Sequence, residues 1–373
     1  MSTIVVGAGT FGASLAWHLA RAGEPVTLVD QFEPGDRRAT SGGETRLIRC
    51  GHGADADYTA MARRARTLWR ELEAESGEDL LHECGVAWFA HGEDGWEAAS
   101  ERAMLAQDIP VERLDVAAAA RMFPTLRGDD LAFVLLEPEA GVVRAQQAVR
   151  ALARQAVAHG ARLVRARARP HGETVVLEHG SRLAADRVIW ACGGWLSKLF
   201  GDLVSLTVTR QELLFLDGGA AWRSPAVPAW VDYDAAMYGT ADVDAIGVKA
   251  ALDLEGPPLD PDAPLDDRPT TVGKVRSYVH DRFPALTRAR LKEARACRYE
   301  LSPDSHFIAA RHPELERVWL VGGGSGHGFK HGPAMAERIV AAMAGGEPLP
   351  ARFGLGERLP GRSFRTAGSG VVS

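Results

Sequence analysis

The sequence predicts an α/β fold with some α+β character, and two observations support this. The first 30 residues read as a strand, a glycine turn, a helix and a second strand. Near the other end, residues 318–343 again read as a strand, a glycine-rich turn and a helix. Because domains usually hold roughly 100–200 residues, the length of 373 residues predicts two domains.

The opening segment matches a Rossmann-like βαβ unit in order and spacing. The three glycines of its G-x-G-x-x-G pattern allow a tight turn, the close approach of a pyrophosphate and the packing of helix on strand. The helix then begins with its positive dipole end facing the phosphates. An acidic residue at the end of the second strand is placed to accept hydrogen bonds from a ribose. The residues concerned are Gly7, Gly9, Thr10, Phe11, Gly12 and Asp30.

This unit predicts a bound dinucleotide, but the pattern alone does not separate NAD from FAD. The second turn, residues 321–330, favours a flavin. Its many glycines suit a close approach of the backbone to a flat ring, and a lysine beside them would stabilise the negative charge of a reduced flavin. A lone lysine beside glycines also fits a solvated loop. The residues concerned are Gly324, Gly326, His327, Gly328, Phe329 and Lys330.

Composition and charge exclude several other classes. Lys and Arg number 43 and Asp and Glu number 49, a net charge of −6, which argues against a nucleic-acid-binding protein. No apolar run approaches the ~18 residues of a membrane helix, and no charged start precedes the apolar N-terminus as in a signal peptide. The four cysteines form no C-x-x-C pair. We therefore expect a soluble protein in a reducing, cytoplasmic compartment.

Four further segments follow the opening unit, namely Ser41–Arg49, Gly141–Arg144, Cys297–Asp304 and Gly326–Lys330. With them, about residues 1–350 resemble the monomeric sarcosine oxidase and N-methyltryptophan oxidase family, within the D-amino-acid-oxidase-like flavoproteins. The last two segments are the most specific. The resemblance implies a Rossmann-like FAD-binding domain interleaved with a mixed-sheet substrate domain. The FAD-binding domain is expected over residues 1–80, 140–207 and 300–355. The substrate domain is expected over residues 81–139 and 208–299, and a flexible tail over 356–373.

The resemblance also implies which residues hold the flavin. Cys297 stands where the family attaches the flavin 8α-methyl group through a thioether, and Arg295 and Arg298 nearby would lower the pKa of its thiol. Taken alone, a free cysteine more often acts as a small buried apolar side chain. Arg46 matches the arginine that lies against the flavin ring. Further cofactor residues in matching segments are Ser41, Thr45 and Trp195.

Other matches concern the amine and the dioxygen. Arg49 and Lys330 match the pair that binds the substrate carboxylate, a task that suits a guanidinium and an ammonium. Lys249 matches the lysine that activates dioxygen, where a cation stabilises superoxide. Tyr238 and Tyr299 match tyrosines of the substrate pocket. Taken alone, Arg49 and the arginine three residues before it also fit a solvated helical face.

Two positions depart from the family pattern, because Gly42 and Asp253 stand where the family has histidines. A carboxylate in place of an imidazole changes the charge and the hydrogen bonding of the amine pocket. A more basic or bulkier amine, or a cyclic imino acid, then becomes a reasonable substrate. The alternative is that the alignment slips in this loop and Asp253 lies outside the pocket.

The resemblance thus implies an FAD-dependent amine oxidase with catalytic residues among those named. A secondary amine with a carboxylate, such as an N-methyl amino acid, would give an imine, and O2 would be reduced to H2O2. The alternatives are a dehydrogenase of the same fold with another electron acceptor, a flavin-binding subunit without turnover, and an NAD(P)-dependent dehydrogenase. Activity is expected to rise with pH, because the neutral amine reacts. A monomer without a bound metal is expected.

Overall fold

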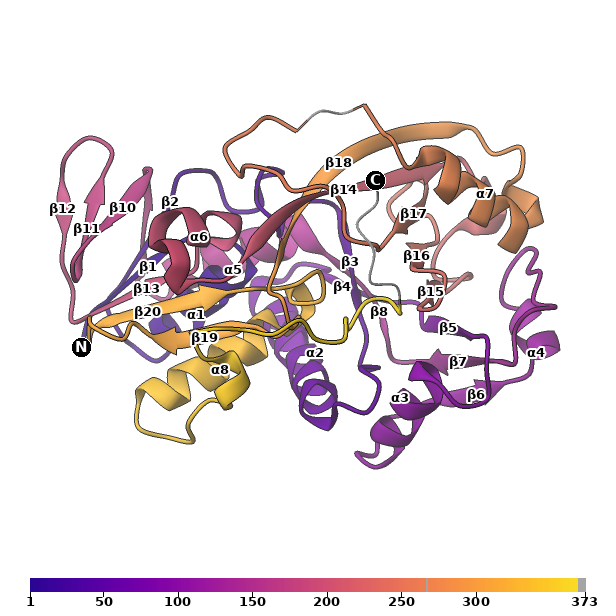
Figure 1. Ribbon diagram of the computed structural model, residues 1–373, viewed down its shortest axis with the longest axis horizontal. Helices are drawn as coiled ribbons and strands as arrows, with labels where there is room; N and C mark the ends of the chain where they lie inside the picture. The colour runs from indigo at the N-terminus through magenta and orange to yellow at the C-terminus, as the bar shows by residue number, and fades with distance from the viewer. Residues whose placement is uncertain (266–267, 368–373) are drawn as a thin grey trace.

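The computed structural model describes residues 1–265 and 268–367, and it consists of two lobes (Figure 1). A six-stranded sheet with its helices forms the lobe that contains the N-terminus, and an eight-stranded sheet forms the other. Two three-stranded sheets complete the structure. The predicted fold class is confirmed, whereas the predicted domain boundaries stay a prediction.

The six-stranded sheet contains the predicted βαβ unit. β1 (Thr3–Val6) leads through α1 (Thr10–Arg21) to β2 (Val26–Asp30), which pairs with β1 in parallel. Because β13 and β20 also run parallel to β1, the glycine turns after β1 and β20 meet at one edge of the sheet. The other strands are β9 (Arg162–Arg165), β13 (Arg187–Trp190), β20 (Val318–Gly322) and the antiparallel β19 (Ile308–Arg311).

Helices pack around this sheet and bury its apolar side chains. α1 contacts α5 (Ala145–Ala158) and α8 (Gly332–Met343), and α2 (Ala56–Ser76) also contacts α8. The small and apolar residues of α1 are almost all buried, which lets α5 and α8 approach closely. At the start of α2, Asp55 accepts a hydrogen bond from the Tyr58 amide at 3.0 Å and caps the helix.

The eight-stranded sheet is mixed. Its strands β15 and β5 pair in parallel, and its other neighbours pair antiparallel. Its helices are α3 (Trp96–Leu105), α4 (Val116–Ala120) and α7 (Val272–Arg282). In spatial order the strands are β18 (Leu291–Leu301), β14 (Thr207–Leu216), β17 (Val248–Leu252), β16 (Met237–Thr240), β15 (Ala229–Asp232), β5 (Val86–Ala90), β7 (Phe133–Glu137) and β6 (Glu112–Leu114).

The smaller sheets place one of the predicted arginines. Arg46 lies on β3, so the alternative that it belongs to a solvated helical face is wrong. The first small sheet contains β3 (Thr45–Ile48), β8 (Gly141–Arg144) and β4 (Leu81–Glu83), and the second contains β10 (Ala168–His171), β11 (Thr174–Leu177) and β12 (Arg182–Leu183). The short helix α6 (Leu196–Phe200) follows β13.

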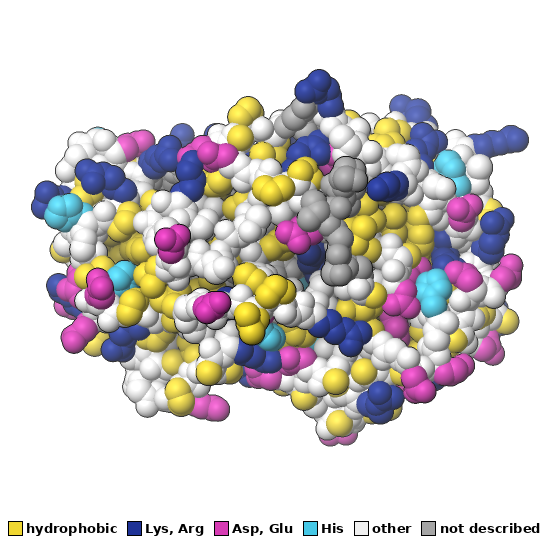
Figure 2. All heavy atoms as spheres, in the orientation of Figure 1, with side chains coloured by type: hydrophobic (Ala, Val, Ile, Leu, Met, Phe, Trp, Pro, Cys, Tyr) yellow, Lys and Arg dark blue, Asp and Glu magenta, His cyan; other side chains and the backbone are white. Residues whose placement is uncertain are grey.

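The surface mixes charges of both signs. Figure 2 shows Lys and Arg interspersed with Asp and Glu, and no basic patch stands out on that face. Within residues 1–265 and 268–367, no helix is long and apolar enough to cross a membrane. All four cysteines belong to these residues, and none is in a disulfide.

The C-terminal segment differs from the expected flexible tail. Phe364, Arg365 and Thr366 are buried, with 9%, 7% and 3% of their surfaces exposed. Phe364 packs against Tyr58 and His327, with ring centroids 4.9 and 5.1 Å apart. The segment therefore returns to the protein because its apolar and charged side chains find buried partners. Residues 368–373, the last part of the predicted tail, lie outside the described residues.

Candidate functional site

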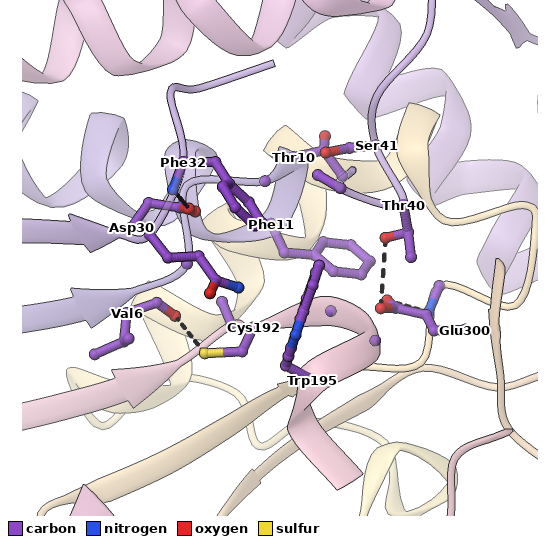
Figure 3. A pocket seen from close by; sticks show the side chains of 18 of the residues that line it. Val6, Thr10, Phe11, Asp30, Phe32, Thr40, Ser41, Cys192, Trp195 and Glu300 are labelled. Atoms are coloured by element: carbon purple, nitrogen blue, oxygen red, sulfur yellow. Dashed lines mark hydrogen bonds between the residues drawn. The ribbon is translucent and has the colours of Figure 1, made fainter. Parts of the chain in front are cut away.

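A cavity of about 260 Å³ opens at the sheet edge where the two glycine turns meet (Figure 3). Most of the predicted cofactor residues line it, namely Gly7, Gly9, Thr10, Phe11, Asp30, Ser41, Arg46, Trp195, Gly324, Gly326, Gly328 and Phe329. Tyr299 lines it as well. The predicted cofactor residues that do not line it are Gly12, Thr45, Cys297, His327 and Lys330.

The first glycine turn has no room for side chains. Gly7 has a φ of +104°, and a Cβ there would lie 2.2 Å from the Ala191 carbonyl oxygen. A Cβ on Gly12 would lie 1.8 Å from the Gly7 carbonyl oxygen, which explains why this glycine is needed although it does not line the cavity. No side chain caps the start of α1, and its first turn holds no acidic residue. Its free amides therefore suit a phosphate group.

Asp30 is held in place by the backbone at the same end of the cavity. Its Oδ2 accepts a hydrogen bond from the Ala8 amide at 2.5 Å, and its Oδ1 accepts one from the Phe32 amide at 2.7 Å. Burial raises the pKa of Asp30, and the two amide donors oppose that shift. A carboxylate offers about four acceptor positions, so Asp30 keeps lone pairs for a ribose.

Sequence reasoning missed several residues of the cavity wall. In Figure 3, Trp195 and Phe11 lie between the Asp30 end and the Glu300 end. Glu300 accepts a hydrogen bond from the Gly324 amide at 3.1 Å, and burial raises its pKa to about 7. The position of Glu300 next to Tyr299 in the sequence is the signal that could have identified it. Other missed residues are Gln31, Phe32, Thr40, Cys192 and Gly193.

Arg46 forms the boundary between this cavity and a group of buried charges. Its guanidinium donates hydrogen bonds to the carbonyl oxygens of Gly42 and Thr45, the second at 3.0 Å. A Cβ on Gly42 would lie 2.5 Å from the Asp36 carbonyl oxygen. The departure from the family histidine at this position therefore fits a tight turn that holds Arg46.

Lys249 is buried on β17, with 3% of its surface exposed. Its Nζ donates a hydrogen bond to the Thr45 carbonyl oxygen at 3.0 Å and lies 5.5 Å from the Tyr238 ring centroid. Burial and the nearby Arg46 charge lower the pKa of Lys249 to about 7. The structure thus brings Lys249 next to Arg46, as a cation that titrates near neutral pH.

The two predicted pocket tyrosines lie together. The hydroxyl oxygens of Tyr238 and Tyr299 are 3.4 Å apart. Asp253 is half-buried nearby, and its charge raises the pKa of both tyrosines. Asp253 therefore belongs to this group of side chains, whereas its place in the amine pocket stays a prediction. Its partner is Arg365, whose Nη1 donates to Asp253 Oδ1 at 2.8 Å, and sequence reasoning missed that arginine.

Arg49 and Lys330 are both buried, and the charge of each shifts the pKa of neighbouring groups. Arg49 donates hydrogen bonds to the carbonyl oxygens of Gly51 and Phe364, the second at 3.1 Å. Lys330 Nζ donates to the His327 carbonyl oxygen at 2.9 Å. Burial lowers the pKa of Lys330, and the Arg49 charge adds to that shift. The two side chains thus lie close enough for the Arg49 charge to act on Lys330, and the Arg49 guanidinium also lies over the Trp88 ring, 4.7 Å from its centroid.

Cys297 lies on β18 opposite Gln211 of β14 and packs near Phe215 and Tyr238. Burial raises the pKa of its thiol, although the charges of Arg46, Lys249 and Arg295 oppose this. The prediction that a neighbouring arginine lowers the thiol pKa is confirmed for Arg295, but desolvation is the larger cause and the pKa is raised overall.

His327 does not line the cavity. Its Nε2 lies 2.9 Å from the Ser305 carbonyl oxygen, and its ring stacks on Phe307. With His52 and His331 it forms a buried cluster in which one nitrogen of each lies within 4.8 Å of the others. Burial and the Lys330 charge lower the pKa of all three histidines. The three rings thus form one buried, closely packed cluster.

The site combines three features of a dinucleotide-binding protein. Two glycine turns meet at one edge of a parallel sheet, the helix start there is uncapped, and a carboxylate lies beyond it. Residues 2–342 match the family described as FAD dependent oxidoreductase. The chain therefore belongs to this family and is an FAD-dependent oxidoreductase. The cavity fits that cofactor, because free amides suit the phosphates at one end and the bare backbone of Gly324 leaves room for a flat ring at the other.

Relatives with known activities cover almost the whole chain. It is 29% identical to the monomeric sarcosine oxidase of Bacillus sp. (strain B-0618), over 91% of both chains. It is also 29% identical to the N-methyl-L-tryptophan oxidase of Yersinia pestis (strain Pestoides F), over 93% of this chain and 95% of the relative. The predicted resemblance is confirmed. The crystal structure of L-proline dehydrogenase from P. horikoshii shares the fold, with a TM-score of 0.83 at 20% identity over 94% of this chain and 96% of that one.

Proposed function

We propose that the chain is an amine oxidase that oxidises the C–N bond of a secondary amine or N-methyl amino acid to an imine and reduces O2 to H2O2. Bound FAD would supply the two-electron acceptor for this chemistry. The observation that carries the proposal is the buried pair Arg49 and Lys330, next to Phe329 of the cofactor cavity. The names of the relatives also support a secondary amine as the substrate class.

In this proposal the substrate carboxylate binds Arg49 and Lys330. Two cations at buried positions would attract an anion strongly, because burial removes the competing water. Tyr238, Tyr299 and Asp253 then surround the amine, and Tyr299 lines the cofactor cavity at the same time. Water would hydrolyse the released imine.

Lys249 is proposed to serve the oxygen half of the reaction. Its ammonium lies among Arg46, Cys297 and Asp253, all close enough to affect its pKa. A cation there stabilises the negative charge that O2 gains with its first electron. The alternative, a dehydrogenase with another electron acceptor, requires Lys249 to have no part in reoxidation.

We further propose that Cys297 holds the flavin through a thioether, that the FAD-binding and substrate domains have the predicted boundaries, and that the chain works as a cytoplasmic monomer. The support for the thioether is the match of Cys297 to the attachment position of the family, since burial raises the pKa of the thiol despite the charges of Arg46, Lys249 and Arg295. Four unpaired cysteines support a reducing compartment. Gel filtration tests the monomer.

The activity is tested with a panel of N-methyl and cyclic amino acids. Peroxide release in air and bleaching of the flavin without oxygen are expected with at least one of them. Bleaching without peroxide, with a slow return of colour in air, would favour the dehydrogenase. If no amine gives either signal, catalysis is rejected and the flavin-binding subunit without turnover remains as the interpretation.

A further inference from the structure

The C-terminal segment 362–367 lies on the substrate side of the candidate site. Its Phe364 and Arg365 side chains are buried and join the group of side chains around Arg49 and Asp253. The Arg365 guanidinium lies over the Tyr299 ring, 5.2 Å from its centroid. Two adjacent residues of this segment therefore occupy space beside the cofactor cavity.

These two residues contact two of the charged groups assigned to the substrate. The Phe364 carbonyl oxygen accepts a hydrogen bond from Arg49 at 3.1 Å. The Arg365 Nη1 donates to Asp253 Oδ1 at 2.8 Å and to the Asp253 carbonyl oxygen at 2.6 Å. An acceptor oxygen thus faces Arg49 and a cation faces Asp253. A zwitterionic amino acid carries this same pair of groups, in its carboxylate and its protonated amine.

The Arg365 side chain also fills the space next to the cofactor wall. A Cβ on Gly326 would lie 2.3 Å from Arg365 Cδ, so the arginine stem packs directly on this glycine. Among the described residues, Arg365 Nε is buried without a hydrogen-bond partner. A small ligand next to Gly326 and Tyr299 would therefore need the space that Arg365 fills.

We propose that Phe364 and Arg365 mimic the substrate, and that an amine substrate displaces them by placing its carboxylate on Arg49 and its protonated amine on Asp253. This inference rests on the proposed function and adds a binding role for Asp253. A buried charge left without a partner is costly. The segment therefore yields to a ligand that supplies both charges, and a carboxylic acid without a cation replaces only one contact.

The test uses N,N,N-trimethylglycine, which carries both charges and lacks the nitrogen lone pair that oxidation needs, and acetate, which carries the carboxylate alone. Trypsin is added to the full-length holoprotein, and cleavage after the buried Arg365 is followed by mass spectrometry. We expect trimethylglycine to accelerate this cleavage several-fold and acetate to leave it unchanged. Unchanged or slower cleavage with trimethylglycine would mean that the segment is a fixed wall of the pocket, and would overturn the proposal.

Binding of trimethylglycine by equilibrium dialysis gives a second measurement. Arg365→Ala should bind it about 10-fold more tightly, because a competing segment lowers the apparent affinity by the fraction of open molecules. Asp253→Asn should bind it more weakly than the unchanged protein. Arg362→Ala is the control, since Arg362 belongs to the same segment but lies over Trp96, 5.0 Å from its ring centroid. Equal or weaker binding by Arg365→Ala would reject the mimicry.

These measurements need no turnover, so they separate the two proposals. If peroxide is released but the segment is not displaced, the proposed activity stands and the mimicry is rejected. If trimethylglycine displaces the segment but no amine gives peroxide or bleaching, the competition between segment and ligand stands and the proposed amine oxidation is rejected.

Discussion

The two ends of the site are built by different means. At the Asp30 end, backbone groups do most of the shaping, through the turn at Gly7, the uncapped start of α1 and the amides that hold the carboxylate. At the other end, charged side chains from distant parts of the chain lie close together, among them the buried Arg49 and Lys249 and the half-buried Asp253. The first end is set by local sequence and the second by the tertiary fold. Substitutions at the Asp30 end should therefore affect cofactor binding, and substitutions at the other end should affect the reaction.

The largest expected effect concerns two cysteines, one at each end. In Cys297→Ser the flavin should leave completely on acid precipitation, because the proposed thioether cannot form, whereas in the unchanged protein the colour stays in the pellet. Cys192→Ser is the matched control, since Cys192 lines the cavity at the other end and its thiol donates to the Val6 carbonyl oxygen at 3.3 Å. Colour in the supernatant of the unchanged protein would contradict the linkage.

The second prediction compares two lysines. In Lys249→Met the reoxidation of the reduced flavin by O2 should slow by roughly 100- to 1000-fold, the usual cost of removing one preorganised charge from a buried site. Stopped-flow absorbance measures the rate. Lys198→Met should change it little, because Lys198 borders the cavity at the nucleotide end and pairs with Asp260 and Asp262 near the surface. Equal rates in both variants would favour the dehydrogenase.

The third prediction tests the end that the backbone shapes. Asp30→Asn should weaken FAD binding roughly 10-fold, because hydrogen bonds to a charged acceptor contribute about 1.5–3 kcal/mol and the amide keeps part of them. The affinity is measured by titration in the Cys297→Ser background, where FAD exchanges freely. The turnover per bound flavin should stay unchanged. A fall in turnover without a loss of affinity would mean that the two ends are not independent.

This division also explains how much could be predicted from the sequence. β1 stands directly before the first glycine turn, as predicted, because a short β-branched run before such a turn is a local signal. Glu300 was missed although it lies in the specific Cys297–Asp304 segment, and Arg365 was missed because it carries no local motif. Each gains its role from a partner far along the chain. The C-terminal segment was expected to be flexible from its composition, yet burial of Phe364 and Arg365 depends on Tyr58 and Asp253, which no local pattern reveals.

The smallest expected effect is a pH dependence that differs between the two half-reactions. Lys249 has a pKa of about 7, lowered by burial and by Arg46 and opposed by the charges of Cys297 and Asp253. The cation is therefore present below pH 7 and lost above it, so reoxidation by O2 should fall about fivefold from pH 7 to pH 8. Reduction by the amine should rise over the same range, because more substrate is neutral.

Lys249→Arg separates the charge from other causes of this profile. An arginine stays protonated throughout this range, so reoxidation in that variant should be independent of pH between 6 and 9. Lys249→Met should be equally independent of pH but slow. A fall above pH 7 that persists in Lys249→Arg would assign the titration to another group near Arg46 and Tyr238, and would remove Lys249 from the oxygen step.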